Sequence, residues 1–312
     1  MWQYLLKRIL NTIIVLFGAV TLTFFFMHFT EGDPATIIAL DKYGGQLISP
    51  EAIDRLASEE GLNRSIFVQY TSWLKLICTG NFGHSLRSGV LVLDEIRLCF
   101  PYTFALALIS VLITGIVATP LGIYSAAYQN RFLDHITRFT ASFKVSIPNF
   151  YLAIIFIFIF SVKLKLLPSF GCDNPTHFIL PVMVLAVSQT GFTIRIVRST
   201  AVEILESEYV QFAFARGLSM NRILFVHVLK NIFIPVLTFL SLQFLMAIEG
   251  SIIIETIFAW PGIGKLFQEA VFGRDFTMIQ ALVLFFAAIV CAINLLVDMV
   301  YVFINRSISL IK

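Results

Sequence analysis

The stretch YTFALALISVLITGIVATPLGIY, from Tyr102 to Tyr124, contains no charged side chain. A helix rises about 1.5 Å per residue, so roughly 20 apolar residues cross the roughly 30 Å hydrocarbon core of a bilayer. A helix also satisfies its own backbone hydrogen bonds, which a bilayer requires of a single spanning segment. The stretch from Tyr102 to Tyr124 therefore predicts a transmembrane helix.

Five further charge-free runs predict an all-α membrane protein with six transmembrane helices. The composition of the 312 residues agrees, because 58% of them are apolar, 13% are charged and the formal net charge is +3. A soluble domain carries about a quarter charged residues, so this chain has too little charge to cover a water-soluble globule. The small net charge gives no reason to expect a nucleic-acid partner. The runs extend from Ile9 to Phe29, Val145 to Val162, Phe178 to Ile194, Ile232 to Ile248 and Phe276 to Val297.

The basic residues in the short connections indicate an orientation, because connections rich in Lys and Arg stay preferentially in the cytoplasm. With six spans both termini lie on one side of the membrane. If that side is the cytoplasm, the inner connections hold many basic residues and only four acidic ones, Asp134, Glu203, Glu206 and Glu208. We therefore expect both termini in the cytoplasm, with residues 1–29 forming the N-terminus and the first span.

Residues 30–101 are too many for a bare connection, and they carry two helix signals. The tripeptide Ser49-Pro50-Glu51 combines a cap, a proline at the first helical position and an acid in the first turn, while Gly61 marks a stop. Apolar residues then repeat at helical spacing over residues 66–77. We expect an extracytoplasmic helical subdomain that either packs on the spans as a lid or contains a ligand site, followed by a membrane core over residues 102–312.

The connection after the fourth span, residues 200–231, has the pattern of a helix pair. Acidic residues stand near its start, where a helix dipole favours them, and Gly217 ends the first helix. Ser219 can cap a second helix, so two short helices meet in a tight turn at Leu218. Such a pair either lies on the lipid surface or inserts into a partner protein. The residues that share one face of the first helix are Val202, Leu205, Tyr209, Phe212 and Arg216.

The segment from Glu208 to Leu218, EYVQFAFARGL, resembles the cytoplasmic coupling loop of binding-protein-dependent ABC importer permeases, specifically their dipeptide, oligopeptide and nickel group. In that family the glycine-centred loop docks into the ATP-hydrolysing subunit. This sequence departs from the broad pattern at Gln211-Phe212-Ala213, in place of Glu-Ala-Ala, and at Leu229-Lys230, in place of Leu-Pro. The resemblance assigns the coupling role to Glu208, Tyr209, Phe212, Ala213, Ala215, Arg216, Gly217 and Leu218.

Other segments resemble the same family in the family's order along the chain. What this implies is a permease subunit that moves small peptides, nickel or nickel chelates across the inner membrane of a bacterium. It also implies a second homologous permease, two ATP-binding subunits, an extracytoplasmic solute-binding protein and surrounding membrane lipid. The segments are Gly32-Asp33-Pro34-Ala35, Gly80 to Ser88, Ser146 to Phe150, Glu255 to Gly264, Arg274-Asp275 and Asn294 to Asp298.

The choice between peptides and nickel stays open, although the short outer connection from Lys163 to His177 resembles nickel-type members slightly more. Two similar permeases would form a homodimer or a heterodimer. The alternative from another class is a self-sufficient channel or secondary transporter. Such proteins often contain two related halves, and no clear internal repeat is visible here.

An ATP-driven importer needs a phosphate-binding loop, and this sequence lacks one. Gly262-Ile263-Gly264-Lys265 resembles the end of such a loop, but Leu266 stands where Ser or Thr should bind magnesium. We therefore expect a transport subunit that is not an enzyme, with ATP hydrolysed by partner subunits. The histidines lack metal-ligand spacing and the cysteines form no CxxC pair, so neither a metal site nor a cofactor is predicted. Free thiols are favoured over a disulfide among Cys78, Cys99 and Cys172.

Glu249 is the candidate residue of the translocation path. It lies about six residues, or roughly 9 Å, from the outer end of the fifth span. An ionisable group at that depth is costly unless it faces water or a partner. The alternative is a protonated or hydrogen-bonded glutamate at a helix contact. Relatives in the resembled family usually have a small residue here. Asp298, nearer the inner end, is expected to be structural.

Overall fold

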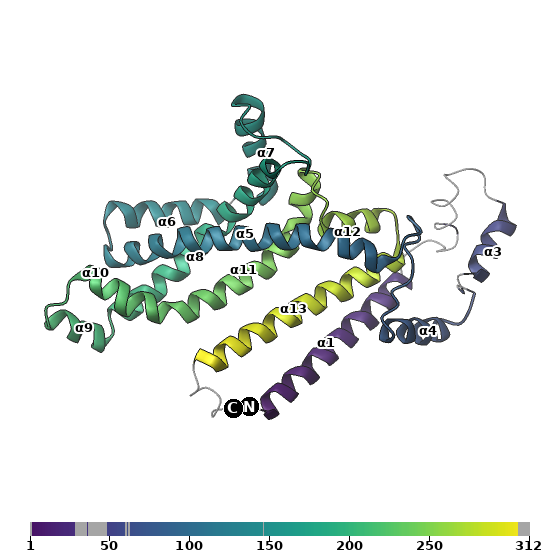
Figure 1. The fold of residues 1–312 in the computed structure, drawn as a ribbon, viewed down its shortest axis with the longest axis horizontal. Helices are drawn as coiled ribbons and strands as arrows, with labels where there is room; N and C mark the ends of the chain where they lie inside the picture. The colour runs from purple at the N-terminus through teal and green to yellow at the C-terminus, as the bar shows by residue number, and fades with distance from the viewer. Residues whose placement is uncertain are drawn as a thin grey trace. The chain divides into compact units, whose positions relative to one another are not determined.

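The computed structural model describes residues 2–28, 36, 49–59, 61, 63–145 and 147–304, and every regular element in this part of the chain is a helix (Figure 1). The Gly32-Asp33-Pro34-Ala35 motif, Ser146, Arg306 and Lys312 lie outside the described residues. The α-helices are α1 (Trp2–His28), α3 (Pro50–Glu59), α4 (Ile66–Cys78), α5 (Val92–Ala127), α6 (Phe132–Val145), α7 (Asn149–Phe156), α8 (Ile179–Leu205), α9 (Glu208–Ala215), α10 (Met220–Ile223), α11 (Leu229–Ile257), α12 (Ile263–Phe272) and α13 (Phe276–Ile304). Two π-helices, η1 (Ile157–Lys163) and η3 (Leu224–Val228), and a 3₁₀ turn, η2 (Pro175–Phe178), complete them.

Five helical stretches among the described residues are long and apolar enough to cross a membrane. Each of them overlaps one of the predicted spans, so the all-α membrane class is confirmed. The stretches are Lys7–Phe26, Val92–Ala127, Pro175–Leu205, Met220–Ile257 and Phe276–Met299.

The remaining predicted span, Val145 to Val162, corresponds to a shorter apolar helix, Asn149–Lys163. Pro148 stands at its N-terminal cap, so the regular helix begins only at Asn149. A helix of about 15 residues extends roughly 22 Å, less than the roughly 30 Å of hydrocarbon. The sixth span therefore stays a prediction.

Helical structure also occupies segments that the sequence placed outside the spans. α5 begins at Val92, so the expected border between residues 101 and 102 falls inside a helix. Asp94 and Glu95 lie in its first turn, where the helix dipole favours acids, and these charges do not interrupt it. Pro120 also lies inside α5, and the basic connection that follows forms the regular helix α6.

The described chain forms two compact units, and the larger one consists mainly of Tyr102–Lys265. Within it α8 packs along both α6 and α11. A first group of buried residues, which we call the elbow cluster, joins α5, α8, α9, α10, η3 and α11. Its members are Ile123, Ala126, Val197, Ala201, Leu205, Val210, Ala213, Ile223, Leu224, Val228, Ile232 and Val236. A second apolar group in the same unit surrounds Phe258 and Trp260.

The other unit contains Met1–Pro101 and Leu266–Asp298. Helices α3 and α4 begin and end close to the predicted signals, and Gly61 has a φ of +68°. α4 packs on α1, because the Tyr70 hydroxyl lies 2.8 Å from Thr21 Oγ1 and the Trp73 ring lies 5.4 Å from that of Phe24. These contacts join α4 to α1, and the choice between a lid and a ligand site stays a prediction.

The N-terminal and C-terminal helices of this unit are joined by an ion pair. Asp298 Oδ1 on α13 accepts a hydrogen bond of 2.9 Å from Arg8 Nη2 on α1, and Asp298 Oδ2 lies 2.9 Å from Arg8 Nε. The structural role expected for Asp298 agrees with this contact.

Candidate functional site

The segment predicted as a coupling loop forms a short helix, α9, that ends in a tight turn at Gly217. The Leu218 N–H donates to the Ala213 carbonyl at 3.2 Å, and the Gly217 N–H donates to the Phe214 carbonyl at 2.9 Å. This pair of bonds is the Schellman C-terminal motif, which places one residue in the left-handed region. Gly217 occupies that position with a φ of +81°. We call residues 208–218 the elbow.

One face of the elbow is buried in its own chain. Val210 has no exposed surface and Ala213 is 7% exposed, and both belong to the elbow cluster. Leu218 packs against the same cluster. The elbow is therefore fixed to the ends of α5, α8 and α11, and of the predicted coupling residues Ala213 and Leu218 contribute to this attachment.

The opposite face of the elbow is open. Tyr209 is 48% exposed and Phe212 is 63% exposed. The Arg216 guanidinium lies 5.7 Å from the centre of the Phe212 ring, in cation-π contact. A Cβ at Gly217 would meet no atom within 4 Å. The remaining predicted coupling residues on this open face are Glu208 and Ala215.

The helix pair differs from its prediction in two respects. α8 ends at Leu205 and α9 starts afresh at Glu208, so Val202 and Leu205 do not share a helix with Tyr209. The second helix is not short, because helical structure continues from Met220 to Ile257 through η3 and α11. The helix continues through Pro235, which lies inside α11.

Glu249 lies on α11 with its side chain exposed on the surface of this chain. Met246, three residues before Glu249, Ile253, four residues after it, and Leu242, seven residues before it, are exposed on the same side of the helix, at 64%, 51% and 47%. The next residue, Gly250, stands beside α7, since a Cβ there would lie 3.9 Å from Asn149 Nδ2. Glu249 therefore lies in a row of side chains that this chain does not cover.

A buried carboxylate that the sequence did not single out lies at the end of α11. Glu255 has no exposed surface; its Oε1 accepts the Thr103 hydroxyl at 2.6 Å and its Oε2 accepts the Lys265 backbone N–H at 2.9 Å. Thr103 in turn accepts the Ile263 N–H at 2.8 Å. These bonds satisfy the N-terminus of α12, where a negative charge is favoured. A Cβ at Gly262 would overlap the Glu255 carboxyl, so the glycine makes room for a side chain.

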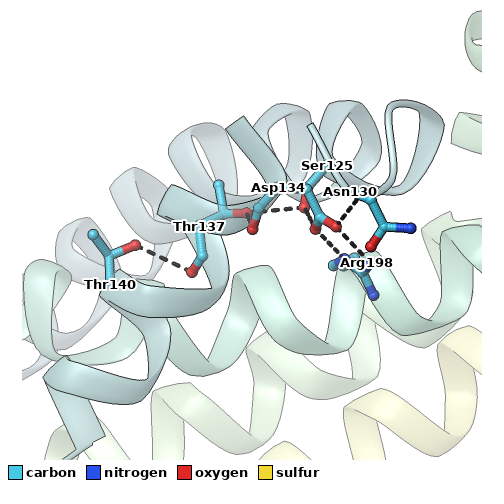
Figure 2. A network of polar contacts seen from close by, with 6 residues as sticks. All are labelled: Ser125, Asn130, Asp134, Thr137, Thr140 and Arg198. Carbon is cyan, nitrogen blue, oxygen red and sulfur yellow. Dashed lines mark hydrogen bonds and ion pairs between the residues drawn. The ribbon is translucent and has the colours of Figure 1, made fainter. Parts of the chain in front are cut away.

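A second buried carboxylate, Asp134 on α6, receives a fork of hydrogen bonds from Arg198 on α8 (Figure 2). The Ser125 hydroxyl donates to Asp134 Oδ1 at 2.6 Å, and the Asn130 N–H donates to Oδ2 at 2.9 Å. The hydrogen bonds from Arg198 lower the pKa of Asp134 far below its ordinary value, against the opposing effect of burial, and the bond from Ser125 lowers it further. Asp134 is therefore ionised at neutral pH.

No group of three or more His, Cys, Asp or Glu residues suited to hold a metal ion occurs among the residues that the structure describes. The four cysteines are free.

Two family models together match almost the whole chain. Residues 118–310 match the model described as binding-protein-dependent transport system inner membrane component, and residues 1–107 match the model of the N-terminal part of such membrane components.

Similar proteins align over 99% of this chain. The dipeptide transport system permease protein DppB of Alkalihalophilus pseudofirmus is 35% identical over its full length. The glutathione transport system permease protein GsiC of Escherichia coli K12 is 35% identical over 99% of its length. The oligopeptide transport system permease protein AppB of Bacillus subtilis is 34% identical over its full length.

A solved structure of the MetNI methionine ABC transporter in inward facing conformations shares the fold. The match has a TM-score of 0.59 at 15% identity and covers 69% of this chain and 98% of the other.

Proposed function

The chain belongs to the family of binding-protein-dependent transport system inner membrane components, and from this premise we propose that it is the permease subunit of an ABC importer of small peptides. The names of three relatives refer to dipeptides, glutathione and oligopeptides, which are all short peptides. This common chemistry favours peptides over nickel or nickel chelates. Family membership also favours the importer over the self-sufficient channel or secondary transporter.

In this proposal the chain forms half of the transmembrane path. A second homologous permease forms the other half, two ATP-binding subunits supply the energy and an extracytoplasmic solute-binding protein delivers the peptide. Six spans cross the inner membrane with both termini in the cytoplasm, residues 30–101 form an extracytoplasmic subdomain and residues 102–312 form the core. The basic residues of the inner connections support this orientation.

The elbow is the proposed contact with the ATP-binding subunits. Tyr209, Phe212 and Arg216 provide exposed aromatic and cationic side chains, which are common anchors in protein interfaces. A two-state transport cycle driven from 1:99 to 99:1 needs about 5.5 kcal/mol of differential binding. A single residue contact does not supply this much, so we expect the open face of residues 208–218 to dock as a whole.

Glu249 is the proposed path residue of this subunit. Its exposed carboxylate interrupts an otherwise apolar row on α11. A carboxylate within a span is stabilised by water or by a cationic group. Both are present in a path that carries peptides with a free amino terminus, so Glu249 is placed there in our proposal rather than against lipid.

The single observation that carries the proposal is the Schellman turn with open space at Gly217, and it permits a sharp test. Gly217→Ala and Gly217→Trp both force a side chain into the left-handed region, at about 1–2 kcal/mol each. Only the tryptophan adds bulk, and a Cβ at this position meets nothing in this chain. The assay compares co-purification of the ATP-binding subunits and uptake of a labelled dipeptide for the two variants.

We expect Gly217→Ala to retain most ATPase association and uptake, and Gly217→Trp to lose both while the subunit still reaches the membrane in normal amounts. Equal association and uptake for the two variants would remove the docking role from the elbow. Uptake by the purified chain alone, without ATP, would favour a channel or secondary transporter.

A further inference from the structure

The Asp134 carboxylate is fully buried and yet ionised, and its partners come from different parts of one unit (Figure 2). Arg198 holds it with two parallel bonds, 2.6 Å from Nε to Oδ1 and 3.0 Å from Nη2 to Oδ2. A bidentate pair of this kind fixes both the distance and the relative rotation of its two side chains. It constrains α6 against α8 more narrowly than an apolar contact of similar area.

The same carboxylate also fixes the end of α5 and the turn that follows. Ser125 lies near the end of α5 and donates to Oδ1, while the Asn130 N–H, in the turn, donates to Oδ2. Asn130 has a φ of +60°, a conformation that asparagine tolerates better than most residues. Thr137 Oγ1, one turn further along α6, lies 2.9 Å from Ser125 Oγ. Three helices therefore meet at one charged side chain.

The neighbouring residues of α8 face the elbow. Val197, directly before Arg198, belongs to the elbow cluster, as do Ala201 and Leu205 further along the helix. The cluster also contains Val210 and Ala213 of α9. The C-terminal part of α8 thus contacts the elbow on one side and the Asp134 carboxylate on the other.

We propose that Asp134 and Arg198 are a positioning pair that fixes α6 and the end of α5 to α8, so that force applied at the elbow moves the three helices together. This inference rests on the proposed function, because it takes the elbow as the place where the ATP-binding subunits act. Replacing both partners of a buried ion pair by apolar residues is often neutral for stability, whereas removing one partner is costly. What an apolar replacement lacks is the directional constraint between α6 and α8.

The test measures the distance between α6 and α8 in the complete complex. Spin labels are attached at Phe139→Cys and Glu203→Cys, both exposed positions, in a chain whose four native cysteines are replaced by alanine. The distance distribution is recorded without nucleotide and with ATP under conditions that block hydrolysis. The test variants are Arg198→Lys, which keeps the charge but not the fork, and Asp134→Asn. Thr140→Val is the matched control, because Thr140 lies on α6 and its hydroxyl donates to the Ile136 and Thr137 carbonyls of its own helix.

We expect the parent and Thr140→Val to show one narrow distance that ATP does not change. Arg198→Lys and Asp134→Asn should broaden the distribution at least twofold and make it respond to ATP, with the ATP-binding subunits still bound. In proteoliposomes their consumption of ATP per labelled dipeptide imported should rise several-fold.

A parent distance that changes with ATP overturns the proposal, because the helices then do not move together. Narrow, unchanged distances in both test variants overturn it as well, as does failure of both to reach the membrane, which indicates a folding role. If the parent itself purifies without ATP-binding subunits, the proposed function fails, while the width of the distribution in Arg198→Lys still decides whether the pair fixes α6 to α8.

Discussion

Gly122→Ala tests the close packing of α5 on α8. Both helices contribute residues to the elbow cluster. A Cβ at position 122 would lie 2.6 Å from Val197 Cγ1, 2.7 Å from Val197 Cβ and 3.1 Å from the Ile194 carbonyl oxygen. Rotation about χ1 moves Cγ1 but leaves Cβ in place, and the carbonyl belongs to the backbone. The two helices must therefore separate. Overpacking of this kind costs about 1–3 kcal/mol.

Gly115→Ala is the matched control on the same helix. Its Cβ would lie 2.9 Å from Leu240 Cδ1, the end of a flexible side chain that can turn away. Both substitutions gain about 1 kcal/mol of helix propensity, so their difference isolates the contact with Val197.

The assay is thermal unfolding of the purified protein in detergent, followed by tryptophan fluorescence. One kcal/mol corresponds to about 2–4 °C in Tm for chains of 150–250 residues. We expect Gly122→Ala to melt several degrees below Gly115→Ala. Equal melting temperatures would refute the close approach of α5 to α8.

Two further predictions concern the buried carboxylates. Glu255→Gln should lower the free energy of unfolding by about 1–3 kcal/mol. The reason is that an amide places a donor against either the Thr103 hydroxyl or the Lys265 N–H. An unchanged Tm in the same assay would contradict the capping role. The lowered pKa of Asp134 means that its stabilising contribution is complete above the ordinary carboxyl value of 3.8 and is lost only as the pH falls through the lower folded value. Asp134→Asn should therefore cost the same stability at pH 6 as at pH 8, and a cost that differs between these pH values would show that Asp134 titrates in the neutral range.

Local signals in the sequence predicted several elements because those signals act locally. The cap and first-turn acid at Ser49-Pro50-Glu51 precede α3, and the apolar repeat over residues 66–77 forms α4. Gly217 was predicted to end a helix, and its φ of +81° gives the reason. Each of these features depends on residues within one or two turns of helix, so sequence spacing is sufficient to find them.

Helix bounds were harder to predict, because a charge marks the edge of an apolar run and not the end of a helix. α5 continues toward its N-terminus through Arg97, Glu95 and Asp94 to Val92. The basic connection after it is helical as α6, although it lacks the apolar length of a span. Hydropathy therefore located the membrane-spanning parts and missed the extensions.

The polar networks escaped prediction because their members lie far apart in the sequence. Asp134 and Arg198 are separated by 64 residues, and Thr103 and Glu255 by 152. Each residue alone fits a solvated charge or a helix cap, and no spacing rule connects them. The signal available in the sequence for a functional charge was a charged residue flanked by apolar helix on both sides. That signal indicated Glu249, whose side chain is exposed, and not the buried networks.

The size of α9 decides how the elbow can act. An isolated helix shorter than about 12–15 residues is marginal in water, and α9 has 8 residues. It therefore keeps its shape through Val210 and Ala213, which pack in the elbow cluster beside residues of α5, α8 and α11. A partner that pulls on its exposed face must either carry the ends of those helices with it or unfold α9. In the proposed function, unfolding of α9 would separate the partner from the spans, so the transport cycle requires the first outcome and the elbow acts as a fixed part of the helices rather than as a hinged loop.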